Sequence, residues 1–64
     1  MTGKEVRAIR QRLRLTQSEL ADKVGVTRNT VTRWEIGLLG IRESAARLLK
    51  RLAAESKEKA RGKN

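Results

Sequence analysis

The chain has 64 residues, with 16 Lys and Arg against 7 Asp and Glu, and so a formal net charge of +9. It contains no histidine and no cysteine, which excludes disulfides, Cys/His metal sites and catalysis by a nucleophile paired with histidine. We therefore expect no catalytic residue, no metal and no cofactor. So large a charge on so short a chain favours a polyanionic partner, and nucleic acid is the leading candidate.

A chain of this length forms one small domain at most. Trp34 is its only aromatic residue, and its β-branched residues do not alternate as they would in strands. We therefore expect an all-α fold with an aliphatic core. No apolar run is long enough to span a membrane, and the N-terminal segment lacks the apolar region of a signal peptide. We expect a cytoplasmic protein with no membrane partner.

The first helix is expected over residues 3–12. Thr2 can cap it, and Glu5 stands three residues later, as in a capping box. Val6 and Ile9 recur at helical spacing and predict an inward apolar side. The other sides carry mainly arginine and lysine, as on a solvated helix surface.

A second helix is predicted to begin after Thr16, because Thr16 and Glu19 have the spacing of another capping box. Gly25 follows the last apolar position, where a left-handed residue closes a helix without a side-chain penalty. The inward side of this helix is apolar at helical spacing and consists of Leu20, Ala21 and Val24.

The third helix is predicted to run from its cap at Thr27 to about residue 36, with Gly37 as its stop signal. Spacing directs Val31 and Trp34 inward. The outward side carries side chains whose hydrogen-bonding groups suit the edges of bases. They are Arg28, Asn29, Thr32 and Arg33.

A glycine-bounded turn over residues 37–40 follows and contains two leucines, Leu38 and Leu39. We expect one of them to be exposed and to serve self-association. A final helix is predicted to begin between residues 42 and 44 and to continue to residue 55. Its apolar stripe comprises Ala45, Leu48, Leu49 and Leu52.

Residues 56–64 are polar and charged, and they lack an apolar side. We expect them to form a disordered basic tail. The predicted organisation is therefore one domain over residues 1–55, with a helix-turn-helix motif over residues 16–36, followed by this tail.

The motif resembles the helix-turn-helix of the phage Cro and repressor family, the Xre-like DNA-binding domains. The residues that match its pattern are Thr16, Gln17, Glu19, Leu20, Ala21, Gly25, Val26, Thr27, Thr30, Val31, Trp34, Glu35 and Gly37. The resemblance implies a lambda-repressor-like domain of about four helices, in which the second helix of the motif enters the major groove.

The resemblance also implies roles for individual side chains. The base-contacting set would be Arg28, Asn29, Thr32 and Arg33. The phosphate-contacting set would be Gln17, Ser18, Thr27 and Arg42. Arg10 and Glu35 stand where relatives have a structural ion pair.

Two features depart from the family pattern. Arg14 stands where glycine is common, and a positive φ there would cost on the order of 1 kcal/mol for arginine. One long helix also replaces the two helices that usually follow the motif. The second departure leaves open which surface forms a dimer.

These observations predict sequence-specific binding of double-stranded DNA by a transcriptional regulator, in the form of a repressor. Because one small module makes few contacts, we expect a homodimer on a palindromic site. The alternative is an antitoxin or another protein-binding module, with a toxin as its partner and DNA binding only for autoregulation. RNA is less favoured, since the chain offers no aromatic platform for unstacked bases.

Overall fold

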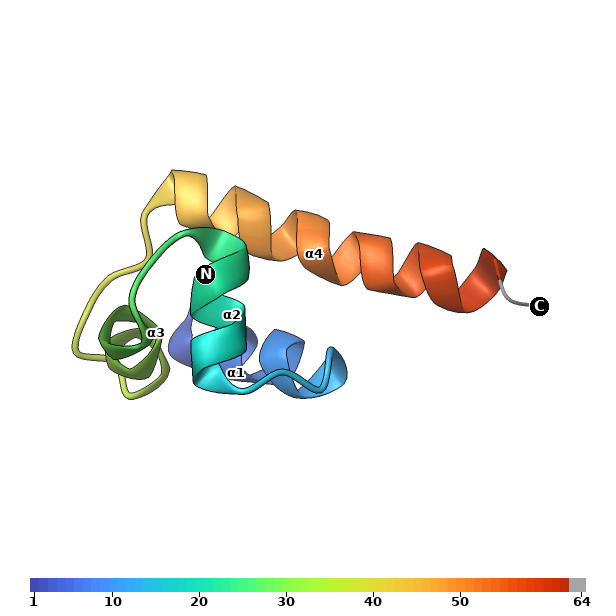
Figure 1. Ribbon diagram of the computed structural model, residues 1–64. Coiled ribbons are helices and arrows are strands. Elements are labelled where there is room, and N and C mark those ends of the chain that lie inside the picture. Colours follow the sequence, from blue (N-terminus) through green and yellow to red (C-terminus); the bar gives the residue numbers. More distant parts are fainter. Residues whose placement is uncertain (63–64) are drawn as a thin grey trace.

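The computed structural model describes the backbone of residues 1–62 and the side chains of residues 1–55. Within this part, the chain forms helices without any strand, which confirms the predicted all-α fold (Figure 1). The helices are α1 (Gly3–Arg12), α2 (Gln17–Val24), α3 (Arg28–Glu35) and α4 (Glu43–Gly62). Helices α1 to α3 cluster together, while α4 lies across them and projects beyond them (Figure 1).

Local hydrogen bonds determine where α1 and α2 begin. The Thr2 hydroxyl accepts from the backbone N–H of Glu5 at 3.3 Å, and the Glu5 carboxylate accepts from the N–H of Thr2 at 3.2 Å. The same reciprocal pair joins Thr16 and Glu19, at 3.1 and 2.8 Å. Both predicted capping boxes are thus confirmed, and each stabilises the first turn of its helix.

Residues with a left-handed backbone conformation follow two of the short helices. Gly25 closes α2 with φ 82°, and its N–H donates to the carbonyl of Ala21 at 2.8 Å. Gly37 follows α3, also with φ 82°. Arg14, in the turn after α1, has φ 58° and is the only described residue other than glycine with a positive φ. A β-carbon in this conformation costs roughly 1–2 kcal/mol.

The core receives side chains from every helix. Its buried members are Val6, Leu20, Ala21, Val24, Val31, Trp34, Ala45 and Leu49. The predicted inward sides of α2 and α3 are therefore confirmed.

The apolar stripe predicted for α4 is only partly right. Leu49 is fully buried, whereas Leu48 is 39% exposed. One residue advances a helix by about 100°, so Leu48 lies at the edge of the core rather than under it.

The turn after α3 was expected to have one exposed leucine, and both of its leucines are exposed. Leu38 is 75% and Leu39 43% exposed. Leu39 also borders a groove that Ala45 and Leu48 of α4 line.

Gly3 marks a close approach of α1 to the end of α3. A β-carbon at this position would collide with the backbone carbonyl oxygen of Trp34. Only glycine lets the first turn of α1 lie against the last turn of α3 in this way. The packing of α1 thereby helps to hold the C-terminal end of α3.

Helix α4 begins at Glu43, within the predicted range, and its backbone continues to Gly62. The side chains of residues 56–64 and the backbone of residues 63–64 lie outside the described part of the chain. The helical backbone thus extends past the predicted end of this helix at residue 55 and into the segment expected to be a disordered tail. Among the described helices, none combines the length and the apolarity needed to cross a bilayer.

Candidate nucleic-acid interface

Helices α2 and α3 pack against each other across the turn at Gly25. The capping of α3 determines its start: the Thr27 hydroxyl accepts from the N–H of Thr30 at 3.3 Å. Burial of Val31 and Trp34 then fixes the rotation of α3 about its axis. The opposite side of the helix is consequently turned to solvent.

This solvent side of α3 presents three polar side chains predicted to contact bases. Arg28, Asn29 and Arg33 are all exposed. Within the described part of the chain, neither arginine takes part in an ion pair. Both guanidinium groups are therefore available to fork onto an acceptor pair such as guanine O6 and N7.

A polar depression lies beside this side of α3, at the start of α2. It has a volume of about 370 Å³ and is lined by Arg10, Thr16, Gln17, Ser18 and Arg28. The backbone N–H groups of Gln17 and Ser18 belong to the first turn of α2, where no helical carbonyl is in reach. The helix dipole adds partial positive charge at the same end. The depression thus suits an anionic group such as a phosphate.

Arg10, which lines the depression, forms an ion pair with Glu35. Arg10 donates from Nε to Glu35 Oε2 at 2.6 Å and from Nη2 to Oε1 at 3.1 Å. Its third donor, Nη1, binds the carbonyl oxygen of Leu15 at 3.0 Å. The structure therefore contains the expected pair between Arg10 and Glu35, which ties α1 to the end of α3. With three donors engaged, little of Arg10 remains for a phosphate.

The two partners perturb each other's protonation. The hydrogen bond with Glu35 raises the pKa of Arg10. Burial alone would raise the pKa of Glu35, but the hydrogen bonds from Arg10 and Gln17 and the nearby positive charge outweigh it, so that this pKa lies below its ordinary value. Both groups are thus held in their charged forms at neutral pH.

Gln17 and Thr32 extend the ion pair into a hydrogen-bonded chain. Gln17 Nε2 donates to Glu35 Oε1 at 3.2 Å, and the Thr32 hydroxyl donates to Gln17 Oε1 at 2.9 Å. Both side chains are half-buried. Sequence reasoning assigned Gln17 to phosphate and Thr32 to bases but missed their bond to each other. The available signal was the three-residue spacing of Thr32 and Glu35, which places them on one edge of α3.

The remaining predicted phosphate contacts do not all gather in the depression. Ser18 lines it, and Thr27 is exposed at the start of α3 while its hydroxyl caps that helix. Arg42 is exposed too, but it lies on the other side of α3, in the segment that leads into α4. The structure thus brings Gln17, Ser18 and Arg28 together and leaves Arg42 apart from them.

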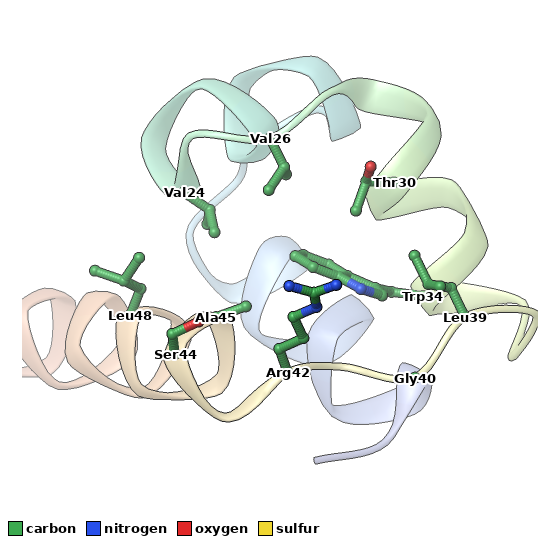
Figure 2. Close-up of a pocket in the computed structure, with 10 residues that line it drawn as sticks. All are labelled: Val24, Val26, Thr30, Trp34, Leu39, Gly40, Arg42, Ser44, Ala45 and Leu48. Atoms are coloured by element: carbon green, nitrogen blue, oxygen red, sulfur yellow. The ribbon is translucent and has the colours of Figure 1, made fainter.

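Arg42 borders a second hollow, an apolar groove of about 370 Å³ between the motif and the start of α4 (Figure 2). Its lining residues are Val24, Val26, Thr30, Trp34, Leu39, Gly40, Arg42, Ser44, Ala45 and Leu48. In Figure 2, Val24 and Val26 face Ala45 across the opening, and the indole of Trp34 lies between them. Sequence reasoning placed Trp34 in the core, where it is, but did not foresee this open edge.

In a comparison with protein families, the family described as helix-turn-helix matches residues 6–55 of this chain, from the first turn of α1 into α4. The match covers the depression, the exposed side of α3 and the apolar groove. Comparisons with curated proteins and with solved structures gave no significant match.

Proposed function

The chain belongs to the helix-turn-helix family, a family of DNA-binding domains, and from this premise we propose that it binds double-stranded DNA sequence-specifically as a transcriptional repressor. One observation carries the proposal. The exposed polar side of α3 lies directly beside a depression suited to phosphate, and Arg28 belongs to both. A helix seated in the major groove needs this combination of base-reading side chains and an adjacent phosphate anchor.

In this proposal, α3 lies in the major groove. Arg28 and Arg33 fork onto guanine, while Asn29 pairs with N6 and N7 of adenine, and each such contact discriminates by about 1–3 kcal/mol. Thr32, on the inner edge of the same side, was predicted to join this set. Its methyl group remains able to contact a thymine methyl, but its hydroxyl is engaged by Gln17.

Phosphate contacts set the orientation of the domain on the duplex. Gln17 and Ser18 hold one phosphate in the depression at the start of α2, and Thr27 and Arg42 contact the backbone on either side of α3. The charge of Arg42 and the net charge of +9 make affinity fall steeply as salt rises, because condensed counterions are released when Lys and Arg neutralise phosphates.

A single module of this size makes few base contacts, so we propose a homodimer on a palindromic site with half-sites about one helical turn apart. The exposed apolar side chains of Ile36 and Leu38, at 63% and 75%, offer a surface for the second copy. Occupation of such a site by a dimer blocks access to the DNA, which is the simplest route to repression.

Selection of bound duplexes from a random pool tests this proposal. We expect enrichment of one half-site sequence, repeated as a palindrome, with a footprint that spans both halves. Recovery of unrelated sequences after repeated rounds would contradict sequence-specific binding. Enrichment of a single unrepeated half-site would instead contradict the homodimer while leaving specific binding intact.

The apolar groove favours a second candidate function, that of a protein-binding module such as an antitoxin. Trp34 and Leu39 line this groove, so a docked apolar segment of a toxin would change the fluorescence of the only tryptophan. Leu39→Ser, which adds no charge near Arg42, should abolish that change and leave DNA binding intact. If this variant lost DNA binding together with toxin binding, the idea that DNA and toxin bind separate surfaces would be wrong.

A further inference from the structure

We infer that Thr32 is a positioning residue, which orients the Gln17 amide so that it can bind a DNA phosphate. The inference rests on the proposed DNA binding and deepens it. It concerns the two bonds that Gln17 makes within the protein, to Glu35 at 3.2 Å and to Thr32 at 2.9 Å.

Chemistry determines which way the Gln17 amide faces. The Glu35 carboxylate, held ionised by Arg10, can only accept hydrogen bonds. The amide must therefore direct its NH₂ group toward Glu35, and its oxygen then faces the Thr32 hydroxyl, which donates to it. If the amide were flipped, its oxygen would face the Glu35 carboxylate oxygen, and neither atom could donate a hydrogen bond.

The arrangement leaves one donor of Gln17 unused. An amide NH₂ group has two hydrogens, and Glu35 takes one of them. The second remains for an acceptor in the depression that Gln17 lines together with Ser18 and Arg28. Because two bonds already fix a side chain with several rotatable bonds, little rotamer freedom is left to lose when a phosphate arrives.

The same bond limits what Thr32 can do for a base. A hydroxyl has a single proton, and the two acceptors within reach are Gln17 Oε1 at 2.9 Å and the Arg28 carbonyl oxygen at 3.1 Å. Either bond keeps the proton inside the protein. Thr32 therefore does not donate to a base edge, and its hydroxyl acts on DNA through Gln17.

The test compares Thr32→Val, which keeps the shape but loses the hydroxyl, with Thr32→Ser, which keeps the hydroxyl. Affinity is measured for the selected duplex and for its single-base variants, at two salt concentrations. We expect Thr32→Val to weaken every duplex by the same factor, roughly three- to tenfold for one lost hydrogen bond. The salt slope should stay nearly unchanged, as in Gln17→Ala, because a neutral amide neutralises no phosphate and releases no counterion. Thr32→Ser should not show this uniform loss, and any change should be confined to the one position where the lost methyl group contacted a thymine.

Two further measurements separate positioning from base reading. The double variant Thr32→Val, Gln17→Ala should bind no more weakly than Gln17→Ala alone, since both changes remove the same phosphate contact. In the free protein, the NMR signals of the Gln17 side-chain NH₂ should move toward those of an unstructured glutamine in Thr32→Val and stay in place in Thr32→Ser.

Other results would overturn the inference. One is that Thr32→Val changes the affinity at a single base position only. Another is that the losses of affinity add up in the double variant. The third is that the Gln17 NH₂ signals do not respond to Thr32→Val. If the wild type bound no duplex at all, the proposed function would fail and the phosphate role with it. The NMR signals would still report separately whether Thr32 orients Gln17.

Discussion

Arg10 and Glu35 are 25 positions apart in the chain, yet two hydrogen bonds of 2.6 and 3.1 Å join them in a forked pair. The pair is largely withdrawn from water, with side-chain exposures of 17% and 6%. It connects α1 to α3 and supports the bond from Gln17 on α2. The orientation of α3 thus depends on a contact that lies away from its exposed polar side.

Removal of the arginine should be costly. Arg10→Met leaves the Glu35 carboxylate buried without its cation, and we expect the free energy of unfolding to fall by about 3 kcal/mol. The double variant Arg10→Met, Glu35→Leu should recover most of this loss, because it leaves no unpaired charge. Urea unfolding measures both. A loss in the double variant as large as in Arg10→Met would show that burial of the charge is not the cause.

Stability should fall in acid through Glu35. Its pKa is lowered in the folded protein, from an ordinary value of 4.5, so its contribution is complete above that value and disappears as pH falls through the folded pKa. The raised pKa of Arg10 affects stability only at very alkaline pH. Urea unfolding from neutral to acidic pH should therefore show a decline.

Glu35→Gln provides the control for this decline. Glu19, whose pKa is lowered by its hydrogen bonds with Thr16, also titrates in this range and remains in the variant. The acid dependence should become shallower without vanishing. An unchanged profile in Glu35→Gln would contradict the assignment to Glu35.

Gly3→Ala should destabilise the protein although alanine is the better helix former by about 1 kcal/mol. The added β-carbon would meet the Trp34 carbonyl oxygen, and we expect a net loss of roughly 1–3 kcal/mol as α1 shifts away from α3. Gly40→Ala is the matched control, because nothing lies near its β-carbon position. Thermal unfolding should show a clear drop for Gly3→Ala alone. Equal effects at both positions would refute the close approach.

Arg14→Gly should stabilise the protein. Arg14 has φ 58°, and glycine adopts this conformation without the steric cost of a β-carbon, although it gains more entropy on unfolding. We expect a net gain of about 0.5–1 kcal/mol. Arg12→Gly, inside the last turn of α1, should instead destabilise by up to about 1 kcal/mol. A loss of stability in Arg14→Gly would show that the Arg14 side chain makes a favourable contact that outweighs its strain.

The sequence predicts those parts of the fold that depend on neighbours along the chain. The capping boxes at Thr2 and Thr16 and the left-handed Gly25 are set within a few residues, so motif spacing located them correctly. The inward positions of Val31 and Trp34 follow from helical periodicity in the same way.

Features that depend on how helices meet were less predictable. The bond between Gln17 and Thr32 requires the relative placement of α2 and α3, which no local pattern encodes. The apolar groove likewise depends on where α4 crosses the motif. Helical periodicity predicted that Leu48 is buried, because periodicity indicates which side of a helix faces inward. It does not indicate how much of that side the neighbouring helices cover.

Arg33→Lys should separate base reading from charge. Lysine keeps the positive charge but lacks the planar fork that matches guanine. We expect relaxed specificity at one base position with a nearly unchanged salt slope, measured by titration of duplexes that differ at single positions. Gln17→Ala should weaken all these duplexes alike. A uniform loss in Arg33→Lys would mean that Arg33 contacts only the backbone.

Competition between duplexes tests the central claim most directly. The wild-type protein is titrated against the selected palindromic duplex and against a random duplex of equal length, at low and at physiological salt. We predict that the selected duplex binds more tightly on the order of a thousandfold at physiological salt, with both affinities falling as salt rises. Equal affinity for the two duplexes, or an affinity indifferent to salt, would contradict sequence-specific DNA binding by this chain.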